Sequence, residues 1–239
     1  MQGTGSRKKK IIRIGAAVLL IVALLFSIRI SKVEVTGNEW YTKEQMEQIL
    51  FPDSMSRITV FCLLQDRLKE HIKIPFVEDY DIVFQKPNQV EVIVYEKSVV
   101  GYVSYMNSYM YFDKDGIIIE SANEALPGVP LITGLTFGQI VLHQKLPVER
   151  PEVFDEILNL TQILSIYDMQ IDRIQYGNFG ETTLYLKDLE VLLGNSGNLN
   201  GKISELNDML PQLEGLKGVL HLEDYDEANI RSGYTLDPK

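Results

Sequence analysis

The residues whose types could support catalysis or metal binding are few and stand far apart. The three histidines are His71, His143 and His221, and the single cysteine is Cys62. No His-x-x-x-His, Cys-x-x-Cys or Gly-x-Ser-x-Gly pattern occurs, so the spacings typical of zinc sites and activated serines are missing. We therefore expect no enzyme activity, no catalytic residue, no cofactor and no metal site. An enzyme would need dispersed side chains that converge only in the fold.

Two short segments resemble ligand loops but each lacks a necessary part. Residues 194–202 hold three glycines ahead of Lys202, but none has the four-residue gap before Gly-Lys that a phosphate loop requires. Residues 113–116 place two carboxylates beside Gly116, yet the further ligands of a calcium loop do not follow. We interpret the first segment as a strand-to-helix turn and the second as a hairpin turn.

The charge of the chain is divided unevenly. The 239 residues carry 33 acidic and 23 basic side chains, but residues 1–32 hold seven basic residues and no acid. The remaining 207 residues hold 16 basic and 33 acidic side chains. Because nucleic-acid binding needs clustered cations, nucleic acid is not an expected partner of so acidic a body.

Residues 11–30 form a nearly continuous apolar stretch after the basic tail of residues 1–10. Twenty residues match the thickness of a bilayer, so we expect a transmembrane signal anchor. A buried soluble helix would show a polar face, and a cleaved signal would show small residues after the apolar run; neither is present. The excess of basic residues ahead of the stretch predicts a cytoplasmic N-terminus and a body, residues 31–239, outside the cell membrane.

Residues 31–97 have the pattern of a strand, two helices and two strands. A Thr-x-x-Gln capping box at Thr42 predicts the start of the first helix. The second helix is expected over residues 60–72, where apolar side chains recur at spacings of three and four and should face the core. These side chains are Phe61, Leu64, Leu68 and Ile72. Two strands are expected over residues 77–85 and 89–96, around Lys86-Pro87-Asn88.

Residues 98–225 predict a second domain of mixed α/β type with a largely antiparallel sheet, so the fold class is α+β. Amphipathic helices are expected over residues 151–167 and 199–213. A final strand is expected over residues 218–223, and the polar residues 226–239 are expected to be a flexible tail.

The order of these parts resembles the FtsQ/DivIB family of bacterial cell-division proteins, over about residues 7–225. The motifs that carry the resemblance are mostly turns, glycines and prolines behind a signal anchor. They are residues 33–38, 75–77, 86–88, 90–97, 112–116, 130–134 and 191–194, followed by Lys202, Ile203 and Leu206. Lys97-Ser98-Val99 departs from the family's Arg-x-Pro, and residues 56–59 replace a usual Gly-Asn-Asn-like stretch.

The resemblance implies a non-catalytic scaffold of the division septum, with a POTRA domain over residues 31–97 and a second domain over residues 98–225. It implies that the partners are FtsL-like and FtsB/DivIC-like membrane proteins, linked to the septal peptidoglycan synthase. In the family a partner adds to the open sheet edge near the C-terminus, which by position means Val219, Leu220, Leu222 and Tyr225 here. Alternatively, the apolar members of this set are core residues. The alternative function is a membrane-anchored POTRA adaptor of another envelope process, such as sporulation, transport or envelope assembly.

Overall fold

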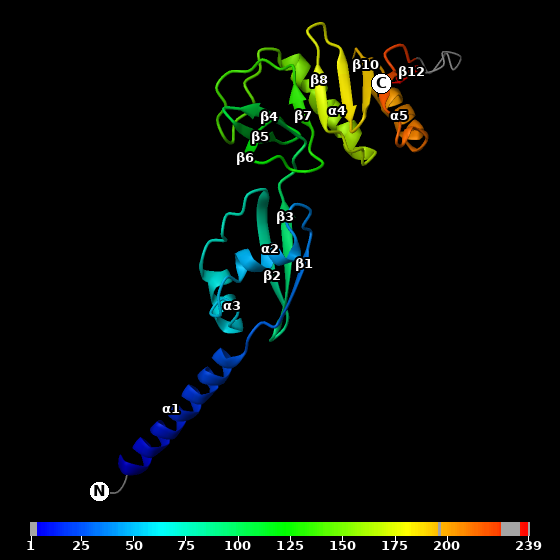
Figure 1. Cartoon of the computed structure of the whole chain (residues 1–239). Helices are drawn as coiled ribbons and strands as arrows, with labels where there is room; N and C mark the ends of the chain where they lie inside the picture. The colour runs from blue at the N-terminus through cyan, green and yellow to red at the C-terminus, as the bar shows by residue number, and fades with distance from the viewer. Residues whose placement is uncertain (1–3, 196, 226–234, 239) are drawn as a thin grey trace. The chain divides into compact units, whose positions relative to one another are not determined.

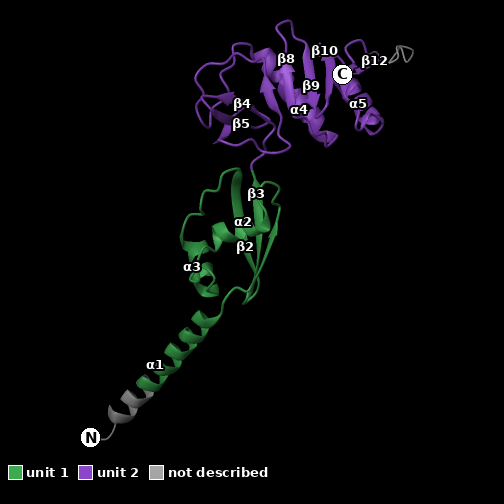
Figure 2. Cartoon of the chain, in the orientation of Figure 1, with its two compact units in different colours: residues 1–96 green, residues 97–239 purple. Residues whose placement is uncertain are grey.

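The chain divides into two compact units, residues 1–96 and 97–239 (Figures 1 and 2). The computed structural model describes residues 4–195, 197–225 and 235–238, and the side chains among these from Ile12 onward.

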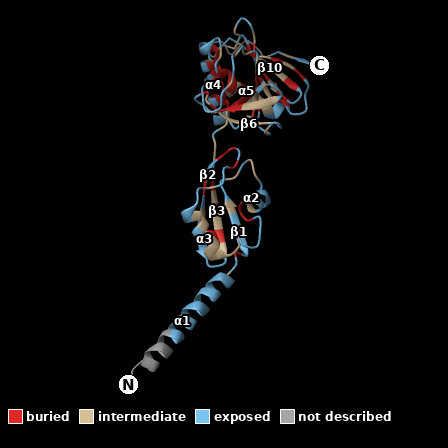
Figure 3. Ribbon diagram, turned by 90° about the vertical axis from the view of Figure 1, so that its left-hand side faces the viewer, coloured by how far each residue is buried: buried red, intermediate tan, exposed pale blue. Residues whose placement is uncertain are grey.

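The first unit begins with helix α1 (Thr4–Ser27). Every residue from 12 to 27 is exposed, as the pale blue colour of α1 in Figure 3 shows, although most of these side chains are apolar. Within the described residues, no helix combines the length and the apolar character needed to cross a membrane. The transmembrane helix expected over residues 11–30 is therefore not found.

The end of α1 has a specific cause. The Ile28 carbonyl accepts a hydrogen bond from the Thr59 N–H (3.1 Å), and the Ile30 N–H donates to the Arg57 carbonyl (2.7 Å). Ile30 is also buried in the core of the unit. Because these groups are bonded to Arg57 and Thr59, residues 28–30 belong to the folded body and not to the helix.

The rest of the first unit has the expected order of strand, two helices and two strands. Among its described residues the sheet has the order β1-β3-β2, with β1 parallel and β2 antiparallel to β3. The predicted capping box starts α2: the Thr42 hydroxyl accepts from the Gln45 N–H, and the Gln45 side chain accepts from the Thr42 N–H. The elements are β1 (Lys32–Thr36), α2 (Lys43–Leu50), α3 (Thr59–Leu68), β2 (Val77–Lys86) and β3 (Gln89–Glu96).

The buried face of α3 differs from the one its apolar spacing predicts. The helix ends at Leu68, and its buried residue is Cys62, whereas Leu64 and Leu68 are 47% and 77% exposed. The first residue, Thr59, is held by the Ile28 carbonyl on one side and donates its hydroxyl proton to the Pro87 carbonyl (2.6 Å). This anchoring sets the rotation of the short helix, so Cys62 and not the longer apolar stripe faces the sheet.

The second unit is built on one large, mostly antiparallel sheet, which confirms the α+β class. Its described residues form nine strands in the order β12-β11-β10-β9-β8-β7-β4-β5-β6. The strands are β4 (Gly101–Tyr105), β5 (Ser108–Phe112), β6 (Ile118–Ala122), β7 (Leu131–Thr133), β8 (Arg173–Tyr176), β9 (Thr182–Leu186), β10 (Leu189–Gly194), β11 (Gly218–His221) and β12 (Thr235–Pro238).

Helices α4 (Pro151–Ile166) and α5 (Leu199–Leu213) contact each other and cover one face of this sheet. Buried and half-buried residues alternate along β9 and β10, as expected for a sheet with one covered face. The predicted apolar positions of α4 are all buried: they are Val153, Ile157, Leu160 and Leu164. These residues join the inward side chains of the strands in one core cluster.

Two strands were not expected from the sequence. β7 lies in the middle of the sheet, parallel to β4 and β8, but its register with β4 holds one residue pair, Tyr102 with Leu131. β12 lies at the sheet edge, within the segment expected to be a flexible tail. Residues 226–234 and 239 of that tail lie outside the described residues.

Candidate functional site at the C-terminal sheet edge

The candidate partner site is built on β11, which runs parallel to β10 after the crossover helix α5. The pairing continues beyond the strand, because the Leu222 N–H donates to the Leu192 carbonyl (2.9 Å). At the other end, the Gly218 N–H donates to the Asp188 carbonyl (3.3 Å). β11 is therefore fixed on its inner side along its whole length.

A buried lysine of α5 binds the backbone at the C-terminal end of β11. The Lys202 ammonium donates to the carbonyls of Leu193 (2.5 Å), Asn195 (3.4 Å) and Glu223 (3.2 Å). Lys202 is 3% exposed, and this burial lowers the pKa of its ammonium group. The negative charges of Glu223 and Asp224 partly oppose the lowering. Three donors matched to three carbonyls allow this cation to join the ends of β10 and β11.

The four expected partner residues lie on or just after β11 but point in different directions. Leu220 and Leu222 are each 1% exposed and belong to the core cluster. Val219 is half-buried on the opposite side of the strand, and Tyr225 is half-buried in the turn that follows. The structure brings the four into one segment, and their contact with a partner stays a prediction.

The outer edge of β11 is occupied, which corrects the expectation that this strand is the open edge. β12 pairs with it in antiparallel register, with Val219 opposite Asp237 and Leu220 opposite Leu236. Among the described residues, β12 is the last strand at this end of the sheet. In this structure the unpaired backbone groups at this edge of the sheet are therefore those of β12.

His221 connects the two strands electrostatically. Its Nδ1 lies 2.8 Å from Glu223 Oε1, and its Nε2 lies 3.3 Å from Asp237 Oδ2. The hydrogen bond to Glu223 and the nearby charge of Asp237 raise the pKa of His221. The protonated ring donates from both nitrogens and thus favours the docked position of β12.

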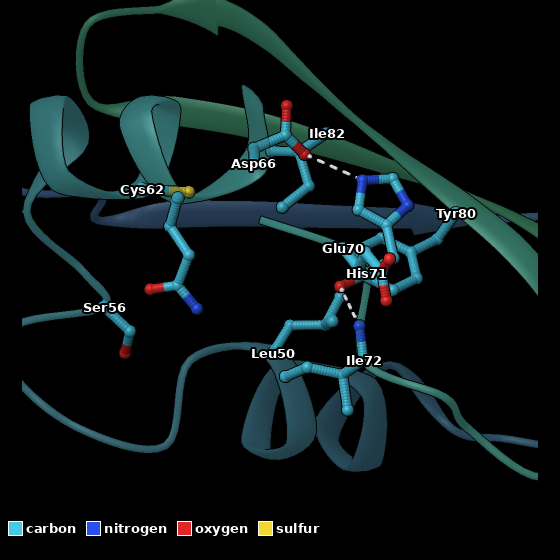
Figure 4. A pocket seen from close by; sticks show the side chains of 10 residues that line it. Leu50, Ser56, Cys62, Asp66, Glu70, His71, Ile72, Tyr80 and Ile82 are labelled. Atoms are coloured by element: carbon cyan, nitrogen blue, oxygen red, sulfur yellow. Dashed lines mark hydrogen bonds and ion pairs between the residues drawn. The ribbon is translucent and has the colours of Figure 1, made fainter. Parts of the chain in front are cut away.

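A second candidate site is a small pocket in the first unit, between α3 and β2 (Figure 4). His71 stacks on Tyr80, with ring centroids 4.4 Å apart, and its two nitrogens lie near Asp66 (3.5 Å) and Asp79 (2.5 Å). The hydrogen bond to Asp79 raises the pKa of His71. The pocket measures about 40 Å³, room for water but far less than the several hundred Å³ of a typical ligand site.

The chemistry of this pocket is that of a structural cluster. Burial, with a smaller effect of the Asp66 charge, raises the pKa of the Cys62 thiol to about 11, so the thiol is neutral and a poor nucleophile at physiological pH. In the part of the chain that the structure describes, no three His, Cys, Asp or Glu side chains are grouped to hold a metal ion. The sheet edge is the better candidate for function.

The sequence of this chain matches the model of a known protein family. The family model described as "Cell division protein FtsQ/DivIB, C-terminal" matches residues 101–229, more than half of the 239 residues. The chain belongs to the FtsQ/DivIB family. This confirms the resemblance found in the sequence, and the family is one of cell-division proteins.

A curated relative of the same family is the "Cell division protein DivIB" of Clostridium acetobutylicum. It is 24% identical to this chain over 151 residues, which cover 61% of the chain and 59% of the relative. The matched region thus spans about three fifths of the length of this DivIB protein. Its name says that it is a cell division protein and says nothing of partners.

The FtsQ/DivIB match includes β11 and ends before β12. A strand at residues 218–223 was expected from the sequence, but the roles of the residues that shape its edge, Gly218, His221 and Asp237, were not. A signal for Gly218 was present, since a glycine at the start of an apolar strand often marks a close backbone approach. No local signal marked Asp237, whose role depends on pairing across a long stretch of chain.

Proposed function

We propose that this FtsQ/DivIB protein is a non-catalytic scaffold of the bacterial division machinery. In this proposal the domain expected over residues 98–225, which lies within the second unit, pairs the sheet edge at its C-terminal end with an extended segment of an FtsL-like or FtsB/DivIC-like partner. The observation that carries the proposal is the C-terminal edge of the sheet, where β11 is fixed by β10 and Lys202 and pairs with the outermost strand, β12. Edges of this kind bind partners through backbone hydrogen bonds, with side-chain pockets adding selectivity.

We further propose that the first unit anchors the scaffold and spaces it from the cell membrane. Support for anchoring comes from the exposed apolar side chains of α1 between Ile12 and Phe26 and from the basic residues ahead of them. The N-terminus would be cytoplasmic and the bulk of the chain extracytoplasmic, concentrated at the septum. The strand–helix–helix–strand–strand order of residues 31–97 supports a POTRA-type module.

Anchoring has a direct test, which is needed because the described part of α1 falls short of a full span. Membranes from cells that express the full chain are washed with alkaline carbonate, and the chain is detected in pellet and supernatant. Retention in the pellet supports the anchor. Release into the supernatant would mean that α1 only lies on the membrane surface or contacts another protein.

Partner binding is tested by photocrosslinking in dividing cells. A photoreactive residue replaces Val219 or Tyr225, which are half-buried, and a matched control carries it at Leu142, which is exposed elsewhere on the second unit. We expect the first two positions, and not the control, to capture small division proteins of the membrane. Capture of other envelope proteins, together with a fluorescent fusion that does not gather at midcell, would favour the adaptor function instead.

A further inference from the structure

We infer that the apolar outer face of α3 is a second membrane contact of the first unit, which lies along the headgroup boundary of the bilayer beside the end of α1. We call this surface, made of Phe61, Leu64 and Leu68, the α3 outer face. Its occupant is a lipid surface with anionic headgroups. The contact rests on the anchoring of α1 proposed above, because α1 must first bring the unit to the membrane.

The first support is the position of α3 at the end of α1. Helix α1 ends at Ser27, and the carbonyl of the next residue, Ile28, accepts a hydrogen bond from the N–H of Thr59 (3.1 Å), the first residue of α3. Arg29 and Ile58 form a β-bridge beside this bond, and the two helices contact each other (Figure 1). A bilayer that holds α1 up to its C-terminal end therefore reaches the first turn of α3.

The second support is the row of apolar side chains along the outer face. Leu64 and Leu68 are exposed, and Phe61 is half-buried. Helical residues three and four positions apart lie on one side of the helix, so these three side chains form one stripe. The sheet does not need this stripe, because Cys62 is the residue of α3 that is buried against the core. An exposed apolar row of this kind marks a contact with protein or lipid.

The third support is the distribution of charge around α3. The chain after residue 32 holds twice as many acidic as basic side chains, yet Arg67, Lys69 and Lys73 are all basic and exposed. The two acids of this segment, Asp66 and Glu70, line the pocket between α3 and β2 (Figure 4). Basic side chains beside an apolar stripe are typical of helices that lie on anionic bilayers, because their stems contact acyl chains and their charged ends reach headgroups.

A lipid surface fits this face better than a second copy of the chain. Helix α3 has ten residues, and its exposed large apolar side chains are Leu64 and Leu68. That surface is small beside the roughly 800 Å² per partner that a stable protein interface buries. A contact with lipid needs less area, because α1 would already hold the helix next to the bilayer and the second contact would form within one anchored molecule.

The chain contains an internal reference for a test, because its one tryptophan lies at the other end of the first unit. The Trp40 N–H donates to the Glu96 carboxylate (3.0 Å), at the last residue of β3. The first residue of β3, Gln89, follows Asn88, whose carbonyl accepts from the Ser31 N–H (2.9 Å) close to α1. An eight-residue strand is about 23 Å long, so Trp40 lies far from the end of α1.

The test places a tryptophan on the α3 outer face and measures its quenching by lipid. The full chain is reconstituted in vesicles of phosphatidylglycerol and a phosphatidylcholine with brominated acyl chains. Leu64→Trp and Leu68→Trp are made in a Trp40→Phe background, so that each variant has a single tryptophan. The controls are the wild type, which has Trp40, and Tyr95→Trp in the same background, because Tyr95 is exposed next to the last residue of β3.

We expect Leu64→Trp and Leu68→Trp to lose about half of their fluorescence to the brominated lipid, because the ring enters the acyl boundary. Both controls should keep their fluorescence. Quenching should weaken when phosphatidylglycerol is omitted, since the basic side chains then lose their anionic partners. Equal emission of the two variants in brominated and unbrominated vesicles would overturn the inference.

Flotation of the vesicles after an alkaline wash separates this contact from the anchoring on which it rests. A chain that floats with the vesicles while Leu68→Trp is not quenched is anchored without the α3 contact, which overturns the contact alone. A chain that does not float overturns the anchoring and the contact together. Emission that moves to shorter wavelength without quenching, and more so at higher protein density, would assign the face to a second copy and overturn the lipid contact.

Leu68→Cys serves if the tryptophan variants do not fold, as judged by circular dichroism. A fluorescent maleimide would label the new thiol selectively, because Cys62 is buried and its thiol is a poor nucleophile. The label at position 68 should be quenched by the brominated lipid in the same way. An unquenched label on a chain that floats would overturn the inference.

Discussion

His221 Nε2 lies 3.3 Å from Asp237 Oδ2, and this contact crosses from β11 to the strand that covers its edge. The other ring nitrogen, Nδ1, lies 2.8 Å from Glu223 Oε1. The imidazole ring therefore lies between two carboxylates, one of which belongs to β12. The hydrogen bond to Glu223 is the larger cause of the raised pKa of His221.

The attachment of β12 should depend on pH. Because the pKa of His221 is raised in the folded state, its stabilising effect is complete below the ordinary value of about 6.5 and is lost as the pH rises through the raised value. We expect the hydrogen-exchange protection factors of Val219 and His221, whose N–H groups point away from β10, to be higher at pH 6 than at pH 9. The dependence should vanish in His221→Gln and persist in His143→Gln; its persistence in the first variant would contradict the assignment.

Removal of the buried Lys202 ammonium should destabilise the second unit. Lys202→Met leaves three carbonyl acceptors without their donor, and we expect a loss of about 3 kcal/mol in the free energy of unfolding, measured in urea. Lys217→Met is the control, because its ion pair with Asp188 is exposed and should contribute less than about 1 kcal/mol. Equal losses in the two variants would show that the buried ammonium is not a structural link.

Two glycines with similar backbones should respond differently to alanine. Gly134 (φ +87°) and Gly128 (φ +78°) both lie in the left-handed region, but a Cβ at Gly134 would lie 1.8 Å from the Tyr176 carbonyl oxygen, whereas Gly128 faces open space. We expect Gly128→Ala to cost about 1 kcal/mol from backbone strain alone. Gly134→Ala should cost at least about 3 kcal/mol more, or prevent folding. Similar melting temperatures for the two variants would contradict this.

Cys62 should be inert in the folded chain. Its thiol is buried and its pKa is raised to about 11, so very little thiolate is present at pH 8. We expect iodoacetamide to leave the native chain unmodified over an hour, as seen by mass spectrometry, and to alkylate it rapidly in 8 M urea. Rapid modification of the native chain would mean that α3 opens readily or that the thiol is exposed.

The sequence predicted the elements well where local pattern and burial agree. In α4 the apolar period and the core face coincide from Val153 to Leu164, because the helix is long enough to bury a continuous stripe. In α3 the same rule predicted the wrong face, since the anchoring of Thr59 by distant carbonyls fixes the rotation of a ten-residue helix. The C-terminal limit of α1 was missed for a similar reason, because Ile30 is drawn into a core that no local pattern reveals.

The candidate site was only half predictable. The apolar run at residues 218–222 indicated a strand, and the family resemblance indicated its edge. The strand β12 was not predictable, because the segment 235–238 is short, largely polar and ends in proline, which is typical of loose tails. What makes them a strand is the close fit at Gly218 and the contact with His221, and both arise only when the distant segments meet.

The narrow register between β4 and β7 has a mechanical consequence. One registered pair and the Tyr102 N–H bond to the Pro130 carbonyl (3.1 Å) link the hairpin strands β4–β6 to the strands β8–β12, whereas β7 and β8 share three pairs. Under tension across the sheet, these few hydrogen bonds would break before the longer ladders on either side, and the core contacts between the two parts, such as Phe112 against Phe154, would carry the remaining load. A pull on the C-terminal edge would thus break hydrogen bonds first at Tyr102, five strands away from β11.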